Sequence, residues 1–256
     1  MPLLEAKNVS VQFGGLKALS NFQFTLDQGE LVGLIGPNGA GKTTAFNVVT
    51  GVYPPTSGDV ILNGNSIAGL PTFRINRAGL ARTFQNIRLF AGLSVLENVL
   101  VAIDQSAGHD LVGTILRSPK HLRRERGQTA RAMELLDTLG LADRSASLSK
   151  SLPYGDQRRL EIARALATNP RLLLLDEPAA GMNPQEKLDL MNLIRFIRDR
   201  FQIGIWLIEH DMKLVMTICE RITVLDHGET ISEGTPEQVQ RDPKVIEAYL
   251  GEPVHQ

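Results

Sequence analysis

Apolar and polar residues alternate along the N-terminal part of the chain in the pattern of half-buried strands. The alternation predicts two strands, over residues 3–13 and 17–26, joined by a glycine turn. Two more strands are predicted, a short apolar one over residues 30–35 and another over residues 59–62. Residues 42–50 follow a helical pattern. We therefore expect this part of the chain to be rich in β-structure, with one helix.

The middle of the chain changes to a mainly helical pattern, from about residue 86 to residue 168. Apolar residues recur at helical spacing between Ala132 and Leu139, and Gly140 follows them as a stop signal. Residues 104–128 are polar and contain a cluster of arginines, which predicts an exposed helical hairpin or loop with a solvated face. This segment is therefore expected to be a helical insertion.

Strands and helices alternate again in the last third of the chain. Apolar runs predict buried strands over residues 172–176 and 203–208, and a hairpin is predicted over residues 221–233. Polar capping residues followed by proline predict three helices, beginning at Asn183, Thr235 and Asp242. The whole pattern predicts an α/β core that holds a helical insertion.

The composition of the 256-residue chain is that of an ordinary globular protein, with 43% apolar and 21% charged residues. Its formal net charge of −1 provides no basic field for nucleic acid or anionic lipid. The single cysteine, Cys219, excludes an internal disulfide and fits a reducing compartment. No apolar run approaches the ~20 residues of a membrane span, and no signal-peptide pattern is present. We therefore expect a soluble cytosolic chain that contacts a membrane only through a partner.

A glycine-rich loop follows the strand predicted over residues 30–35. It fits the pattern G-x-x-x-x-G-K-[ST], in which successive backbone N–H groups surround an anion and the next helix directs its positive end at it. Lys42 would reach the outer phosphates, and Thr43 would offer a hydroxyl to Mg²⁺. The predicted phosphate-binding residues are Gly36, Pro37, Asn38, Gly39, Ala40, Gly41, Lys42, Thr43 and Thr44. The strand before and helix after favour a nucleoside triphosphate site over an ordinary strand–turn–helix corner.

Two adjacent carboxylates end the apolar run over residues 172–176. Asp176 is suited to the Mg²⁺ shell, and Glu177 could act as the base that polarises the attacking water. Acidic residues after strands are common, and Glu177 could instead cap the next turn. Together with the glycine-rich loop, however, the pair predicts nucleotide hydrolysis.

Five further motifs occur in a characteristic order along the chain. They are Phe13, Gln85, the segment 152–159, the segment 179–183 and His210. This order resembles the ATPase domain of ABC transporters over nearly the whole chain. The resemblance implies that Phe13 stacks on adenine, that Gln85 is the Q-loop glutamine and that His210 is the switch histidine. The two segments stand at the LSGGQ signature and the D-loop.

Several longer stretches are similar to the ATPases of branched-chain amino acid importers. They are Arg82–Phe90, Leu93–Val99, Arg158–Leu166, Leu175–Gly181, Ile208–Met212 and Val245–Gly251. The long segment 104–128 resembles the larger of the two ATPase subunits of such importers. Urea importers share much of this pattern, so urea, amides and other polar amino acids are alternative substrates.

The resemblance implies an α/β fold, a P-loop NTPase of the ABC ATPase type with a mixed sheet core, an antiparallel β subdomain and a helical insertion subdomain. Residues 1–256 would form a single ABC ATPase domain. Residues 1–85 and 170–256 would make up the α/β core with its N-terminal β subdomain. Residues 86–169 would form the helical subdomain that carries the signature.

The resemblance also assigns roles to individual residues. The implied catalytic residues are Lys42, Gln85, Glu177 and His210. Phe13 and Gly155 would join the phosphate loop in binding ATP, and the implied Mg²⁺ ligands are Thr43, Gln85 and Asp176.

The resemblance further implies a head-to-tail dimer with a second ATPase subunit, in which ATP lies between the phosphate loop of one subunit and the signature of the other. Two transmembrane permease subunits would be direct partners, and a periplasmic substrate-binding protein an indirect one. No nucleic acid partner is expected. The chain would lie peripherally on the cytoplasmic face of the inner membrane, as a transport ATPase.

The signature departs from the family pattern. Pro153 replaces its serine and Asp156 its final glutamine, and Asn183 stands where a D-loop aspartate is usual. Pro153 has neither a hydroxyl nor a backbone N–H, so it can donate nothing to a phosphate. Gly155 and the start of the following helix can still donate, so Gly155 is the expected contact to the partner's nucleotide.

Three other functions fit the sequence less well. ABC ATPases of DNA repair need long coiled-coil arms, and no sustained heptads occur here. Those of translation carry two ATPase domains in one chain, whereas 256 residues hold one. A module that senses nucleotide without hydrolysing it would not need Lys42, Asp176, Glu177 and His210 together.

Overall fold

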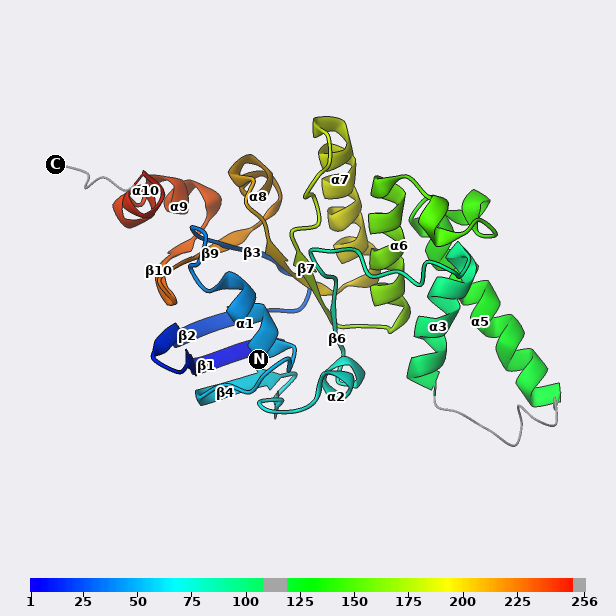
Figure 1. The fold of residues 1–256 in the computed structure, drawn as a ribbon, viewed down its shortest axis with the longest axis horizontal. Helices are drawn as coiled ribbons and strands as arrows, with labels where there is room; N and C mark the ends of the chain where they lie inside the picture. The colour runs from blue at the N-terminus through cyan, green and yellow to red at the C-terminus, as the bar shows by residue number, and fades with distance from the viewer. Residues whose placement is uncertain (108–118, 251–256) are drawn as a thin grey trace. The chain divides into compact units, whose positions relative to one another are not determined.

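The computed structural model describes residues 1–107 and 119–250, and the chain divides into two compact units (Figure 1). The first unit is formed by Met1–Arg82 together with the chain from Arg171 onward, and the second by Thr83–Pro170. Within the described residues, no helix is long and apolar enough to cross a membrane. Part of the expected hairpin or loop over residues 104–128 lies outside the described residues.

The first unit contains a four-stranded sheet in the order β2-β1-β4-β5, in which every pair of neighbours is antiparallel. Its strands are β1 (Leu4–Phe13), β2 (Leu16–Leu26), β4 (Ser57–Leu62) and β5 (Asn65–Ser66). The alternation of apolar residues that predicts β1 and β2 is visible as alternate burial along β2. The predicted antiparallel β subdomain is therefore confirmed.

A six-stranded mixed sheet, in the order β10-β9-β3-β8-β7-β6, forms the second layer of this unit. Only β9 and β10 pair antiparallel, and the remaining neighbours are parallel. The strands are β3 (Leu31–Ile35), β6 (Leu80–Arg82), β7 (Leu172–Asp176), β8 (Gly204–Ile208), β9 (Arg221–Asp226) and β10 (Glu229–Gly234). This confirms the mixed sheet. Strand β6 ends at Arg82, where the chain passes from the first unit into the second.

The helices of the first unit are α1 (Lys42–Val49), α2 (Thr72–Arg77), α7 (Pro184–Phe201), α8 (Met212–Ile218), α9 (Pro236–Arg241) and α10 (Pro243–Leu250). The capping pattern at the start of α7 is confirmed: the Asn183 side chain accepts the Glu186 N–H at 3.0 Å, and the Glu186 carboxylate accepts the Asn183 N–H at 2.9 Å. Thr235 caps α9 in the same way.

Helix α1 packs between the two sheets of the first unit, and the main core forms around it. Trp206 of β8 is fully buried there, with its ring stacked 4.2 Å from the Phe24 ring and 4.6 Å from the tilted Phe46 ring. On the other face of the mixed sheet, Gly33 admits α8, since a Cβ at that position would lie 2.7 Å from Val215 Cγ1. This packing holds the start of α1 at one end of the mixed sheet.

The second unit is mainly helical, and its α-helices within the described residues are α3 (Val95–Ala107), α5 (Pro119–Thr138) and α6 (Tyr154–Ala167). Helix α3 packs against both α5 and α6. Ala132, Leu136 and Leu139 are buried, as the helical spacing predicts, and Gly140 follows α5 with a φ of 69°. The predicted helical character of this segment is therefore confirmed over the described residues.

Candidate functional site

The carboxyl ends of three neighbouring parallel strands carry the predicted chemistry. The glycine-rich loop follows β3, Glu177 follows Asp176 at the end of β7, and His210 lies two residues after β8. These strands are adjacent in the sheet and run in the same direction, so the three segments emerge at one edge. This is the edge at which open α/β sheets bind their ligands.

Lys42 lies at the first position of α1 with its side chain folded back over the glycine-rich loop. Its Nζ donates to the carbonyl oxygens of Gly36 at 2.7 Å and Pro37 at 2.9 Å. Burial lowers the pKa of Lys42 from 10.5, while the nearby carboxylates of Glu177 and Asp176 raise it in part. Because the two hydrogen-bond acceptors of Lys42 are uncharged carbonyl oxygens, a phosphate in the loop would stabilise its buried positive charge further.

The hairpin turn between β9 and β10 supports the glycine-rich loop from behind. The Gly228 N–H donates to the Ala40 carbonyl at 2.9 Å, and the Gly228 carbonyl accepts the Ser20 N–H at 2.8 Å. At the start of the loop, a Cβ on Gly36 would lie 2.0 Å from the Leu225 carbonyl oxygen. Only glycine fits there, so the shape of the loop depends on its packing against the hairpin.

Glu177 and His210 meet at this edge of the sheet. His210 Nε2 lies 2.5 Å from Glu177 Oε1, and the two side chains are 47% and 12% exposed. Glu177 has a φ of 47°, uncommon for a residue with a side chain, and its N–H donates to the Ile208 carbonyl at 2.9 Å. The backbone therefore directs the Glu177 carboxylate toward the histidine, and the structure brings these two predicted residues together.

Glu209 supports His210, although no motif in the sequence singles it out. Its carboxylate is buried and accepts N–H groups from Ala179 at 2.7 Å and His210 at 3.3 Å. Burial raises the pKa of Glu209, and the charge of Glu177 adds to this effect. Glu209 thus joins the segment expected as the D-loop to the segment that carries His210.

Asp176 is held by Arg82, another residue for which the sequence analysis predicted no role. Arg82 Nη2 lies 2.7 Å from Asp176 Oδ2, and both side chains are nearly buried, at 6% and 7% exposure. The described residues contain no group of three or more His, Cys, Asp or Glu side chains that could hold a metal ion. The Asp176 carboxylate and the exposed Thr43 hydroxyl do fit Mg²⁺, which takes one or two protein oxygens together with substrate phosphates.

Phe13 lies at the end of β1 with its ring 48% exposed. The ring packs edge-on against Tyr53, with centroids 5.1 Å apart and planes at 88°. The Tyr53 hydroxyl in turn approaches the Thr44 carbonyl at 3.5 Å. Tyr53, which the sequence analysis did not identify, therefore connects the predicted adenine-stacking ring to the start of α1.

Gln85 and Gly155 belong to the second unit. The backbone of Gln85 is held by fully buried Arg158, which donates to the carbonyls of Phe84 at 2.7 Å and Gln85 at 2.8 Å. Glu161 pairs with Arg158 at 2.7 Å, and burial raises the pKa of Glu161. Helix α6, which starts in the segment predicted to be the signature, thus holds the Gln85 backbone in place.

Pro153 is the N-cap of α6, and its carbonyl accepts the first helical hydrogen bond, from the Gln157 N–H at 2.9 Å. The N–H groups of Tyr154, Gly155 and Asp156 therefore lie in the first turn, before the helical hydrogen bonds begin. Asp156 pairs with Arg144 at 2.7 Å. The structure thus gives Pro153 the role of a cap and leaves donation to the residues after it.

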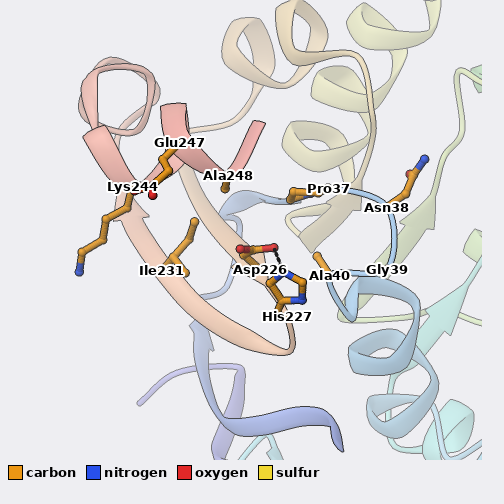
Figure 2. Close-up of a pocket in the computed structure, with 10 residues that line it drawn as sticks. All are labelled: Pro37, Asn38, Gly39, Ala40, Asp226, His227, Ile231, Lys244, Glu247 and Ala248. Carbon is orange, nitrogen blue, oxygen red and sulfur yellow. Dashed lines mark ion pairs between the residues drawn. The ribbon is translucent and has the colours of Figure 1, made fainter. Parts of the chain in front are cut away.

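A pocket of about 630 Å³ lies between the outer side of the glycine-rich loop, the β9–β10 hairpin and α10 (Figure 2). It is lined by Pro37, Asn38, Gly39, Ala40, Asp226, His227, Ile231, Lys244, Glu247 and Ala248. Burial raises the pKa of the phenol of Tyr249, the next residue of α10, and the nearby Gly36 N–H lowers this pKa in part. Helix α10 therefore packs directly behind the loop.

Comparison with known proteins gives consistent matches along the chain. A family model described as "ABC transporter" matches residues 19–180, and one described as "Branched-chain amino acid ATP-binding cassette transporter" matches residues 229–255. The chain is 47% identical over 98% of both sequences to the high-affinity branched-chain amino acid transport ATP-binding protein LivG of Escherichia coli K12. It is 35% identical, over 98% of both, to the lipopolysaccharide export system ATP-binding protein LptB of the same organism. A crystal structure of a nucleotide-free ATP-binding cassette from an ABC transporter superposes with a TM-score of 0.85 at 30% identity, covering 98% of this chain and 100% of that one.

Proposed function

Because the chain belongs to the ATP-binding proteins of ABC transporters, we propose that its ATPase activity drives the uptake of branched-chain amino acids. The observation that carries this substrate is the similarity to LivG, which spans nearly the whole chain and exceeds the similarity to the export protein LptB. The match of the C-terminal segment to a branched-chain amino acid transporter model supports the same substrate. The individual roles that follow are part of the proposal.

ATP binds with its phosphates in the loop from Gly36 to Thr44. Backbone N–H groups surround the phosphates, and Lys42 turns from the Gly36 and Pro37 carbonyls toward the phosphate charge. Phe13, supported by Tyr53, stacks on the adenine. Its half-exposed ring supports this role, because a fully buried ring could not meet a ligand.

Thr43, Asp176 and Gln85 would hold Mg²⁺. The metal would neutralise part of the charge of the ATP phosphates. Asp176 suits this role because its carboxylate is anchored by Arg82 at the end of β7. Gln85 reports the state of this site to the second unit, since its backbone is held by Arg158 of α6.

Glu177 acts as the general base for hydrolysis. It accepts a proton from water while the water oxygen forms a bond to the γ-phosphorus, and the bond from the γ-phosphorus to the bridging oxygen breaks to leave ADP. His210 supports the reacting water and the γ-phosphate beside Glu177. The 2.5 Å contact between the two side chains supports this division of roles.

Two ATPase subunits pack head to tail, and the first turn of α6, with Gly155, completes the nucleotide site of the partner. Residues 1–256 act as one domain, in which residues 86–169 move the signature relative to the core. Hydrolysis removes the bridging charge, and the dimer opens. The pair works at the cytoplasmic face of the membrane on two permease subunits, which a periplasmic binding protein supplies with substrate.

The proposed chemistry is tested with Glu177→Gln. We expect ATP binding to stay within about twofold and phosphate release at saturating ATP to fall by ~10²–10⁴-fold, as for loss of a general base. Glu186→Gln is the matched control, because glutamine also serves in the capping box of α7. Near-normal phosphate release by Glu177→Gln would exclude the base role.

The proposed substrate is tested by uptake of labelled leucine, isoleucine and valine into cells that depend on this chain. Uptake should be lost with Glu177→Gln and retained with Glu186→Gln. Loss of urea uptake, with leucine uptake unchanged, would instead assign the chain to a urea importer.

A further inference from the structure

Arg82 ends β6 and is the last residue of the first unit before the chain enters the second. Its side chain is only 6% exposed, so its charge and its N–H donors need partners from the protein. Two different elements supply them. Asp176 of β7 accepts from Nη2 at 2.7 Å, while Asn47 Oδ1 and Thr50 Oγ1, at the end of α1, accept from Nη1 at 2.7 and 3.1 Å.

Those two elements also carry both of the side chains proposed to hold Mg²⁺ in the first unit. Thr43 lies in the first turn of α1, and Asp176 ends β7. The guanidinium therefore connects the helix that carries one proposed ligand to the carboxylate of the other. Helix α1 has only eight residues, so an anchor at its end also restrains its first turn.

The geometry points to Arg82 as a positioning residue that sets the distance between Thr43 and Asp176 and orients the Asp176 carboxylate for Mg²⁺. This inference rests on the proposed function, in which Asp176 is a metal ligand. Arg82 anchors Oδ2, and a carboxylate has a second oxygen that can face the metal or its water. Residues that anchor a metal-binding carboxylate in this way usually change metal affinity by 10–100-fold when they are replaced.

An arginine is required because this side chain must bind two structural elements at once, α1 and β7. One terminal nitrogen faces the carboxylate and the other faces α1, and the Arg82 Cζ lies over the Phe46 ring, 5.5 Å from its centroid. A lysine has one ammonium group and cannot hold both sides in a fixed geometry. Arg82→Lys should therefore keep the positive charge but lose the positioning effect.

The test is equilibrium binding of a fluorescent ATP analogue in the Glu177→Gln background, in which turnover is blocked. Each variant is measured in EDTA and then titrated with MgCl₂, and its thermal unfolding is recorded. The variants are Arg82→Gln, Arg82→Lys, Asn47→Ala and Asp176→Asn. Arg77→Gln, a change on the exposed face of α2, is the matched control.

We expect Arg82→Gln to raise the Mg²⁺ concentration for half-maximal tight binding by about tenfold or more, with binding in EDTA unchanged within about twofold. Arg82→Lys should give most of the same increase, Asn47→Ala a smaller one of about threefold, and Arg77→Gln none. If Arg82→Gln does not fold, the Lys and Ala variants decide the question.

A purely structural role would give a different pattern. In that case the Arg82 variants would lower the unfolding temperature but keep the Mg²⁺ concentration for half-maximal binding within twofold of the parent, and Asp176→Asn would raise this Mg²⁺ concentration. That result would overturn the positioning role of Arg82 and leave the proposed metal site in place. If Asp176→Asn itself leaves the Mg²⁺ requirement unchanged, the metal assignment of the proposed function fails, and the inference about Arg82 fails with it.

Discussion

His210→Ala should separate catalysis from stability, because the contact that it removes is close but partly exposed. The imidazole lies 2.5 Å from the Glu177 carboxylate, yet its side chain is 47% exposed. A pair with that exposure stabilises a fold by about 1 kcal/mol or less, since water screens it. If His210 supports the reacting water, however, its loss should reduce phosphate release by ~10²–10⁴-fold, which corresponds to about 3–5 kcal/mol in the transition state.

Two measurements test this difference. Urea unfolding gives the free energy of unfolding, and phosphate release at saturating ATP gives the rate. His227→Asn is the matched control, because His227 also lies near a carboxylate, 3.8 Å from Asp226, but its side chain is 95% exposed. Asparagine tolerates the positive φ of 46° found at that position. A loss of more than about 2 kcal/mol in the free energy of unfolding of His210→Ala, or phosphate release within twofold of the parent, would contradict this separation of catalysis from stability.

Three further outcomes are expected. Burial raises the pKa of Glu209 above its usual 4.5, so the folded state binds a proton more readily than the unfolded chain, and this carboxylate favours folding less as the pH rises above 4.5. In urea unfolding, the free energy of unfolding of Glu209→Gln should therefore increase relative to that of the parent between pH 4.5 and 7. A difference that stays constant over this range would contradict the raised pKa. Trp206→Ala should lower the free energy of unfolding by about 3–5 kcal/mol. Trp206→Phe should lower it by less than about 1.5 kcal/mol, because among the described residues the buried Trp206 Nε1 has no hydrogen-bond partner to lose. Equal losses for the two variants would contradict the role of Trp206 in packing. Pro153→Ser should not lower ATPase activity, since it restores a donor at the signature, and a tenfold loss in phosphate release would mean that the proline itself is needed.

Much of the fold could be predicted, because long periodic segments bury one face. The alternation along β1 and β2, the apolar runs of β3, β7 and β8 and the cap of α7 are all readable from neighbouring residues. Helices α2 and α8 were not predicted, since six and seven residues are too few to establish a helical period. Strand β5 was not predicted either, because its two residues are too few to show an alternation of apolar and polar side chains.

The residues that hold the site together were harder to predict than the residues proposed to bind ATP or to take part in its hydrolysis. Lys42, Glu177 and His210 belong to motifs, whereas Arg82 meets Asp176 across a sequence separation of 94 residues. No local pattern marks such a partner, because it is defined only when β6 and β7 pair. Glu209 is similar, since its partner Ala179 is 30 residues away. The expected role of Phe13 came from its position in the chain, which did not indicate the contact with Tyr53.

The route of the chain at the edge of the mixed sheet has a consequence for how such proteins can diversify. The helical unit is inserted between β6 and β7, which pair with each other, and the Gly79 carbonyl accepts the N–H groups of both Arg171 at 2.7 Å and Leu172 at 3.0 Å. The points where the chain leaves and re-enters the sheet are therefore fixed neighbours, whatever lies between them. Replacing the inserted segment with one of different length would change the closure entropy only slowly. The two junctions are thus natural crossover points for recombination, at which the helical unit could be exchanged while the nucleotide-binding sheet is kept.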